Sequence, residues 1–133
     1  MEELGELTGL LIIGLFVLEA FRFVLKQVFK HYGKWIKENT KFHPALQKVM
    51  ALNRTFHPWI GYLIVLLIPV HVAIQTGFQY FSPSGLVAGL LMTTEVIIGF
   101  LGEKVLKKPR PKAWVWAHRL MPIAVMVAIL IHI

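Results

Sequence analysis

Four long apolar stretches constrain this chain more than any other feature of its sequence. They cover about residues 4–28, 58–78, 86–101 and 113–133. Each is near the roughly 20 residues that a helix needs to cross a bilayer. Hydrophobic residues make up 56% of the chain, which is more than one small soluble core can bury. Because backbone groups in lipid must be paired internally, we expect a single all-α domain over residues 1–133, an integral membrane four-helix bundle.

The positions of the basic residues predict how these helices are oriented. All 14 Lys and Arg residues lie in two clusters, at residues 22–54 and 104–119. Cytoplasmic loops carry an excess of Lys and Arg. The connections at 29–57 and 103–112 are therefore expected to face the cytoplasm at the cell membrane, with both termini outside. The same clusters would attract anionic membrane lipid, and no nucleic acid is expected as a partner.

The connection between the first two predicted helices, from Phe29 to Phe56, is long for a small bundle. Its basic residues alternate with apolar ones, namely Trp35, Ile36, Phe42, Leu46, Val49 and Leu52. This pattern is typical of a helix that lies in the plane of the membrane interface, and Pro44 suits the first turn of a helix. We expect an amphipathic interfacial helix between transmembrane helices one and two.

Two of the apolar stretches carry the same histidine spacing. His57 and His71 bracket 13 residues, and so do His118 and His132. A helix turns by about 100° per residue, so the 14 steps from one histidine to the next end about 40° short of four full turns. Both histidines therefore lie on one face of their helix. They are about 21 Å apart along its axis. The expected topology makes the two helices parallel. His57 should then share an inner level with His118, and His71 should share an outer level with His132.

Two histidines that face each other from rigid helices are a ligand set for a six-coordinate haem. The chain has no cysteine, which excludes thiolate metal sites and iron–sulfur clusters and leaves histidine as the main ligand for a transition metal. Ionisable groups inside a membrane are costly and usually functional. The sequence thus predicts two bis-histidine haems, one for each pair. The alternative for each histidine is an ordinary helix residue whose ring is satisfied by a neighbouring carbonyl.

This arrangement resembles the four-helix di-haem core of the cytochrome b of quinol–cytochrome c oxidoreductases, and the transmembrane domain of ferric reductases and NADPH oxidases. The resemblance covers essentially the whole chain and rests mainly on the four histidines. It implies that all four are axial ligands of two b-type haems. It also implies helix glycines that let the macrocycle approach, for which Gly85 and Gly99, 14 residues apart, and Gly14 are the candidates.

Arg54 and Arg119 are candidate partners of the propionates of the inner haem. Arg54 lies three residues before His57, and Arg119 directly follows His118. Arginine offers a bidentate fork to a carboxylate. An equally weighted alternative is that Arg54 and Arg119 are interfacial anchors, present because cytoplasmic loops are rich in Lys and Arg.

Two acids lie inside the predicted spans. Glu19 precedes Arg22 and Lys26 on the same helix and is expected to pair with them. Glu95 has no obvious partner along the sequence. It is either a proton carrier in quinone chemistry or a neutral acid that is hydrogen-bonded to Thr94 or to a carbonyl. His31 and His43, in the basic connection, are expected to be ordinary exposed histidines.

The predicted function is that of a di-haem b-type cytochrome which carries electrons between an inner-side and an outer-side redox partner. No dinucleotide-binding motif is present, so the electrons must come from a quinol or from another protein. Three roles stay open: a pure relay, a quinone-reactive subunit of a larger complex, and a stand-alone reductase or oxidase of a small acceptor such as ferric chelate or superoxide. Whether the chain is itself an enzyme stays open with them.

The quinone-reactive role would add a bound quinone near one haem, close to Glu95 or His31. A rival of another class is a haem-free metal transporter or membrane anchor that uses the same histidines. Zinc favours carboxylates close to the histidines. No acid lies within one turn of any of the four along the sequence, which favours haem.

Overall fold

The computed structural model describes residues 2–133 as long helices with short connections. The four α-helices are α1 (Glu2–Asn39), α2 (His43–Thr76), α3 (Pro83–Phe100) and α4 (Lys112–His132), and a π-helical segment, η1 (Leu101–Val105), continues α3. Each α-helix is long and apolar enough to cross a membrane, η1 being counted with α3. The prediction of an all-α chain with four such helices is confirmed.

The apolar side chains of these helices point largely outward. Leu10, Leu66 and Leu130, on three different helices, are each 65% exposed. A soluble protein rarely exposes apolar surface on this scale. Together with the four candidate spans, this surface indicates a multi-pass membrane protein.

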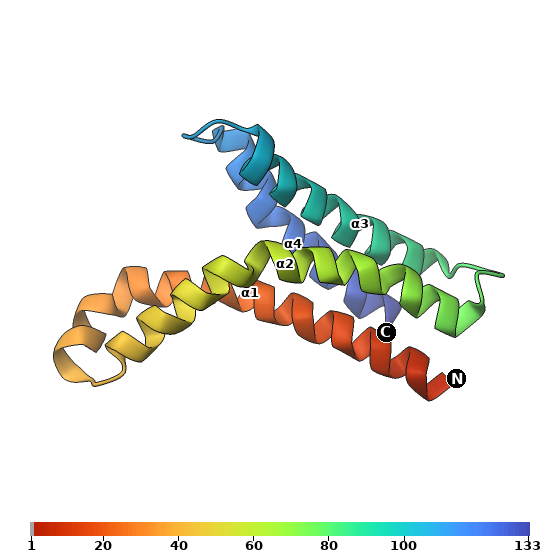
Figure 1. Ribbon diagram of the computed structural model, residues 1–133, viewed down its shortest axis with the longest axis horizontal. Coiled ribbons are helices and arrows are strands. Elements are labelled where there is room, and N and C mark those ends of the chain that lie inside the picture. The colour runs from red at the N-terminus through yellow and green to blue at the C-terminus, as the bar shows by residue number, and fades with distance from the viewer. Residues whose placement is uncertain (1) are drawn as a thin grey trace.

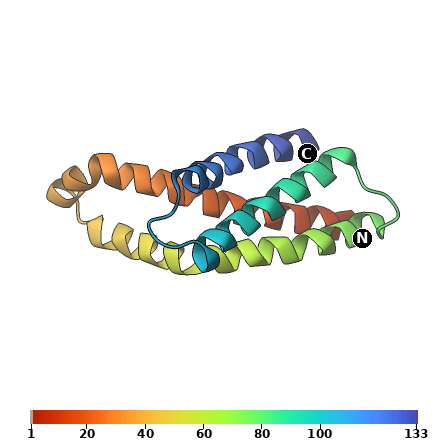
Figure 2. The same ribbon diagram turned by 90° about the horizontal axis from the view of Figure 1, so that it is seen from above.

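The helices form two antiparallel hairpins that cross each other (Figure 1). α1 packs mainly on α2, and α3 packs mainly on α4, whereas the two hairpins meet chiefly through α2 and α3. Two views show that α2 and α4 run in the same general direction (Figures 1 and 2). Both ends of the described chain lie at the same end of the structure.

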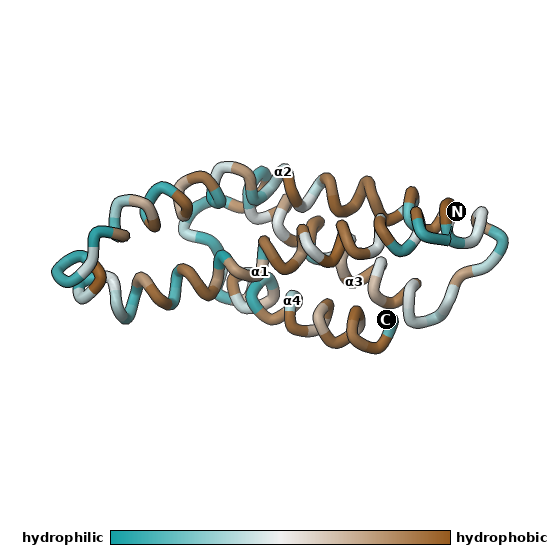
Figure 3. The backbone as a smooth tube through the Cα atoms, turned by 90° about the horizontal axis from the view of Figure 1, so that it is seen from below, coloured by the Kyte–Doolittle hydropathy of each residue, from teal (hydrophilic) through white to brown (hydrophobic). Residues whose placement is uncertain are grey.

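The segment from Phe29 to Phe56 differs from its prediction, because residues 2–133 contain no interfacial helix between α1 and α2. α1 instead continues to Asn39, the chain turns at residues 40–42, and α2 begins at His43 with Pro44 in its first turn. These helices have 38 and 34 residues. At about 1.5 Å per residue they exceed the roughly 30 Å of a hydrocarbon core. Their paired ends extend as a helical hairpin in which hydrophilic and hydrophobic residues alternate and whose tip is hydrophilic (Figure 3).

Packing between the two helices explains why the interfacial prediction is wrong. Ile36, one of the apolar residues of the pattern, is buried. The rings of Phe29 and His43 lie 5.6 Å apart, one on each helix of the hairpin. A helix on lipid and a helix on a neighbouring helix both need one apolar face. The local pattern is therefore the same for both, and here part of that face is used between α1 and α2.

The core lies where all four helices meet, midway between the two histidine levels. Its buried residues are Ile12, Phe16, Ile64, Met92, Val125 and Ile129. Val125 is 0% exposed. Ile64 on α2 and Val125 on α4 each stand seven residues from both histidines of their helix. An apolar layer thus separates the inner histidines from the outer ones.

The same seven-residue spacing, close to two helical turns, occurs on the other two helices. On α1 it links Gly5, Ile12 and Glu19, and on α3 it links Gly85, Met92 and Gly99. The middle residue of each series, Ile12 or Met92, is buried in the core. The bundle therefore has three layers, with an apolar middle and a histidine level on either side.

Candidate functional site

The inner level brings His57 of α2 and His118 of α4 together. Their ring centroids lie 6.0 Å apart, with the ring planes inclined by 68°. Both side chains are partly buried. Metal–imidazole bonds are about 2.0–2.1 Å long, so one metal ion bound by two opposed rings holds their centres roughly 6 Å apart. The separation of these rings fits such an ion.

Each inner histidine contacts a carboxylate through Nδ1. Nδ1 of His57 contacts Oε2 of Glu19 on α1, and Nδ1 of His118 lies 2.8 Å from Oε1 of Glu95 on α3. The two glutamate side chains are only 10% and 14% exposed. In each inner contact, the acid comes from the other helix of the same hairpin.

These contacts correct the expectation for Glu19 and give Glu95 a different neighbour from the expected one. The predicted pairing of Glu19 with Arg22 and Lys26 is wrong, because Glu19 faces the interior on the same side of α1 as Ile12, where it meets His57. Glu95 contacts His118, whereas the hydroxyl of Thr94 donates to the carbonyl of Leu90. Within residues 2–133, both carboxylate oxygens of Glu19, Oε2 of Glu95, and Nδ1 of His57 and of His118 are buried without a hydrogen-bond partner. The two inner contacts are therefore close approaches of a carboxylate to a ring nitrogen and not formed hydrogen bonds.

The outer histidines use Nδ1 as well, but their partners are neutral. Nδ1 of His71 lies 3.0 Å from the carbonyl oxygen of Gly5 and 3.2 Å from Oγ1 of Thr8, both on α1. Nδ1 of His132 lies 3.2 Å from Oγ of Ser84 on α3. The rings of His71 and His132 form no aromatic pair within the part of the chain described.

All four histidines therefore share one feature. In each polar contact that their rings make within residues 2–133, the ring atom is Nδ1. A metal-ligating histidine usually gives its second ring N–H to a carboxylate, a carbonyl or another acceptor, which fixes the tautomer and the ring orientation. The alternative for each histidine was an ordinary helix residue whose ring is hydrogen-bonded to a neighbouring carbonyl. Within residues 2–133, His71 alone lies within hydrogen-bond distance of a backbone carbonyl, so this alternative describes one of the four histidines at most.

Glycines on α1 and α3 border the imidazole rings. A Cβ atom added to Gly85 would lie 2.8 Å from Cε1 of His132, and one added to Gly99 would lie 3.4 Å from Cε1 of His118. On α1 the equivalent position is Gly9, where a Cβ would lie 3.1 Å from Cε1 of His71. Gly14, the third glycine of the prediction, has nothing within 4 Å of an added Cβ. Gly85 and Gly99 thus border the ligand candidates, and Gly14 does not.

Trp114 is a further neighbour of the inner level, and no sequence signal pointed to it. Its ring stacks on His118, with centroids 5.1 Å apart and planes inclined by 22°. Its Nε1 donates to the carbonyl of Ile98 at 2.8 Å. The guanidinium group of Arg110 lies 5.0 Å above the indole ring. These contacts hold the start of α4 against the end of α3.

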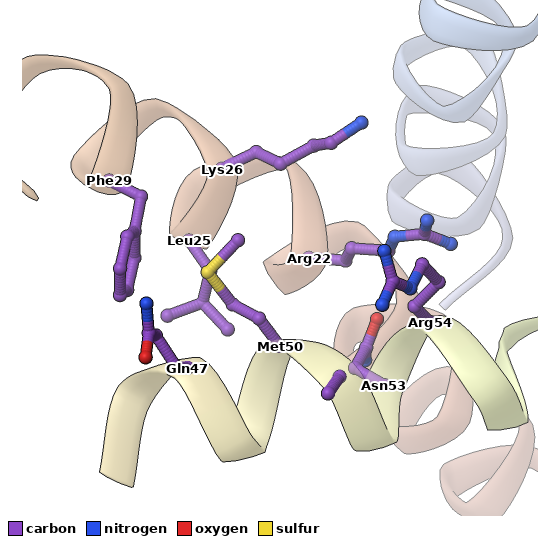
Figure 4. Close-up of a pocket in the computed structure, with 9 residues that line it drawn as sticks. Arg22, Leu25, Lys26, Phe29, Gln47, Met50, Asn53 and Arg54 are labelled. Atoms are coloured by element: carbon purple, nitrogen blue, oxygen red, sulfur yellow. The ribbon is translucent and has the colours of Figure 1, made fainter. Parts of the chain in front are cut away.

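Arg54 lines a pocket of about 350 Å³ between α1 and α2, close to the inner level. Arg22 and Lys26 line the same pocket, and the guanidinium groups of Arg22 and Arg54 lie beside each other (Figure 4). The charges of Arg54 and Arg119 both act on Lys26. Within residues 2–133 none of these four cations forms an ion pair. Arg22 and Lys26 join the two predicted cations because Glu19 turns away from them.

A second pocket, of about 600 Å³, lies between α3 and α4. Its lining is almost wholly apolar, and Ser84, the partner of His132, is the hydroxyl-bearing residue in it. Neither Glu95 nor His31, which the quinone-reactive role placed near a quinone, lines this pocket. His31 lies instead on the exposed surface of the α1–α2 hairpin.

No protein-family model, curated protein or solved structure matches this chain. Within residues 2–133, no three His, Asp or Glu side chains come close enough to one another to hold a metal ion by themselves. The fold defines the chain as a protein with four potential membrane-spanning helices. Its function must be inferred from the geometry of the two histidine levels.

Proposed function

We propose that the chain binds two haem b groups and carries single electrons across the cell membrane between an inner-side and an outer-side redox partner. The observation that carries this proposal is the common arrangement of the four histidines. Nδ1 of each ring lies against a polar group on α1 or α3. Nε2 of each ring is left to bind iron, as expected for a ligand histidine.

His57 and His118 would ligate the inner haem, and His71 and His132 the outer one. The 6.0 Å between the inner ring centroids supports the first assignment. The second is supported by the identical 14-residue spacing on two helices that run in the same direction. It is also supported by Gly9 and Gly85, which border the outer rings.

The cations near the inner level suit the propionates of a haem. Arg54 and Arg119 are the predicted partners, and Arg22 shares the pocket with Arg54. Like charges that gather without carboxylates favour an anionic partner, and a guanidinium group can hold a carboxylate through two parallel hydrogen bonds.

Haem b supplies a reversible one-electron couple between ferric and ferrous iron. The residues of this chain fix the imidazoles, hold the propionates and keep water out. In one turnover, an inner-side quinol or reduced protein loses one electron and an outer-side acceptor gains it. The buried layer around Ile64 and Val125 keeps a dry, rigid spacer between the two levels.

A haem-free metal-binding protein is the second candidate, and one observation favours it. Glu19 and Glu95 lie beside His57 and His118, although no acid is near these histidines along the sequence. Carboxylates combined with imidazoles are common ligands of zinc. This candidate uses the inner level alone and assigns no role to the outer pair.

The test is a dithionite-reduced minus oxidised spectrum of detergent-purified protein from haem-replete cells, with a pyridine haemochrome count. We expect a b-type α band and two haems per chain. His71→Ala or His132→Ala should lower the count to one. His31→Ala, on the exposed hairpin, is the matched control and should leave two. A protein without an α band, or one that holds zinc or copper in place of haem, would overturn the proposal.

A further inference from the structure

We propose that Glu19 and Glu95 are positioning residues that give the inner haem a lower reduction potential than the outer haem. With the expected topology, electrons would then pass spontaneously from the inner side to the outer side. This inference rests on the proposed function, and it adds to it a direction of electron flow.

The two levels differ in the chemistry of the groups that hold Nδ1. At the inner level both partners are carboxylates, Glu19 and Glu95. At the outer level the partners of His71 are a carbonyl and a hydroxyl, and the partner of His132 is a hydroxyl. The hydroxyl of Thr8 itself donates to the carbonyl of Gly5 at 2.8 Å. Among residues 2–133, no charged group forms a hydrogen bond or ion pair with the ring of an outer histidine.

A carboxylate changes the imidazole more than a neutral acceptor does. A carboxylate beside Nδ1 attracts the Nδ1 proton more strongly than a neutral group does. It thereby makes Nε2 a more basic ligand. A more basic ligand and a nearby negative charge both favour ferric iron, which carries one more positive charge than ferrous iron. The inner couple is thereby shifted to lower potential.

The cations around the inner level raise the reduction potential of the inner haem. Whether this potential lies below that of the outer haem therefore depends on how strongly the cations act. Arg54, Arg119 and Lys26 are exposed, where water and salt screen their charges, and Arg22 is partly buried beside Arg54. Within residues 2–133, none of these four cations forms a hydrogen bond or an ion pair with an inner histidine. The propionates would also neutralise part of that charge. Glu19 and Glu95 contact the ligand rings directly and are almost buried, where the low dielectric strengthens their effect. The carboxylates therefore outweigh the cations.

The test is a redox titration of the purified di-haem protein, followed at the α band. We expect two resolved one-electron steps. The double variant His71→Ala/His132→Ala keeps the inner haem alone, and His57→Ala/His118→Ala keeps the outer haem alone. These two proteins assign each potential to its level without any change at Glu19 or Glu95.

Glutamine variants then test the cause. Glu19→Gln and Glu95→Gln keep the shape of the side chain and remove its charge. Each should shift the lower step upward by about 59 mV, which for one electron is a tenfold change in the reduction equilibrium. Thr8→Val and Ser84→Ala should shift the higher step and leave the lower one. Thr94→Val is the neutral control, because Thr94 bonds only to its own helix.

Two results would overturn the inference while leaving the proposed function intact. One is a lone inner haem whose potential equals or exceeds that of the lone outer haem. The other is a lower step that stays in place in both glutamine variants. If a glutamine variant fails to retain haem, Glu19→Asp or Glu95→Asp keeps the charge and should restore both haem and the low potential. Absence of haem from the unmodified protein would instead contradict the proposed function itself.

Discussion

Trp114 is held on several sides, and each contact involves a residue next to the inner histidine level. Its ring stacks on His118, and its Nε1 donates to the carbonyl of Ile98. Gly102 is a further neighbour of Trp114. It is buried, and a Cβ atom added there would collide with the indole ring. The indole ring therefore fills the space that the missing side chain of Gly102 leaves.

We predict that Gly102→Ala destabilises the protein. The indole ring can move away only by losing its stacking or its hydrogen bond, so overpacking should cost about 1–3 kcal/mol and lower the thermal unfolding midpoint in detergent, measured by circular dichroism. Gly14→Ala is the matched control, because an added Cβ meets nothing within 4 Å there and alanine favours a helix by about 0.5–1 kcal/mol. Equal midpoints for Gly102→Ala and the unmodified protein would contradict this packing.

The residues that could be predicted from the sequence are those with a spacing along one helix. The four histidines, Gly85 and Gly99 belong to this group. The partners of the histidines, such as Glu19 and Thr8, were not predicted, because contacts between helices depend on how each helix is rotated about its axis. One signal was available: the seven-residue series on α1 and α3 match those on α2 and α4.

At the scale of elements, the α1–α2 hairpin is the main departure from expectation. The four helices themselves follow from hydropathy and length. Their ends do not, because α1 and α2 continue beyond the apolar stretches and stabilise each other by packing. Hydropathy identifies the part of a helix that suits lipid, and it contains no information on where a helix supported by protein contacts stops.

This hairpin predicts a specific cross-link. The chain has no natural cysteine, so Phe29→Cys with His43→Cys creates one pair, at positions where the native rings lie 5.6 Å apart. A short bis-maleimide should join the two within one chain, seen as a mobility shift on a denaturing gel without dimer formation. Phe29→Cys with Tyr80→Cys is the control and should not react, because Phe29 lies beside the start of α2 and Tyr80 lies beyond its end. If residues 29–56 contained an interfacial helix instead, the pair Phe29→Cys and His43→Cys would not be cross-linked, and this result would contradict the hairpin.

At the scale of the whole molecule, the two hairpins repeat one plan. Each has a helix with two histidines, α2 or α4, and a second helix, α1 or α3, whose polar groups lie against Nδ1 of both rings. Each contributes a buried apolar residue of the middle layer from both of its helices. The proposed haems would lie between the hairpins, so each would draw one ligand from each hairpin.

That plan makes the pairing of histidines the central claim, and haem stoichiometry in double variants tests it most directly. His57→Ala/His118→Ala removes both ligands of one site, so we predict one low-spin haem per chain by pyridine haemochrome and spectrum. His57→Ala/His71→Ala removes one ligand from each site, so we predict that no low-spin bis-histidine haem remains. Gel filtration of both proteins controls for folding. One low-spin haem in the second variant, or none in the first, would contradict the account.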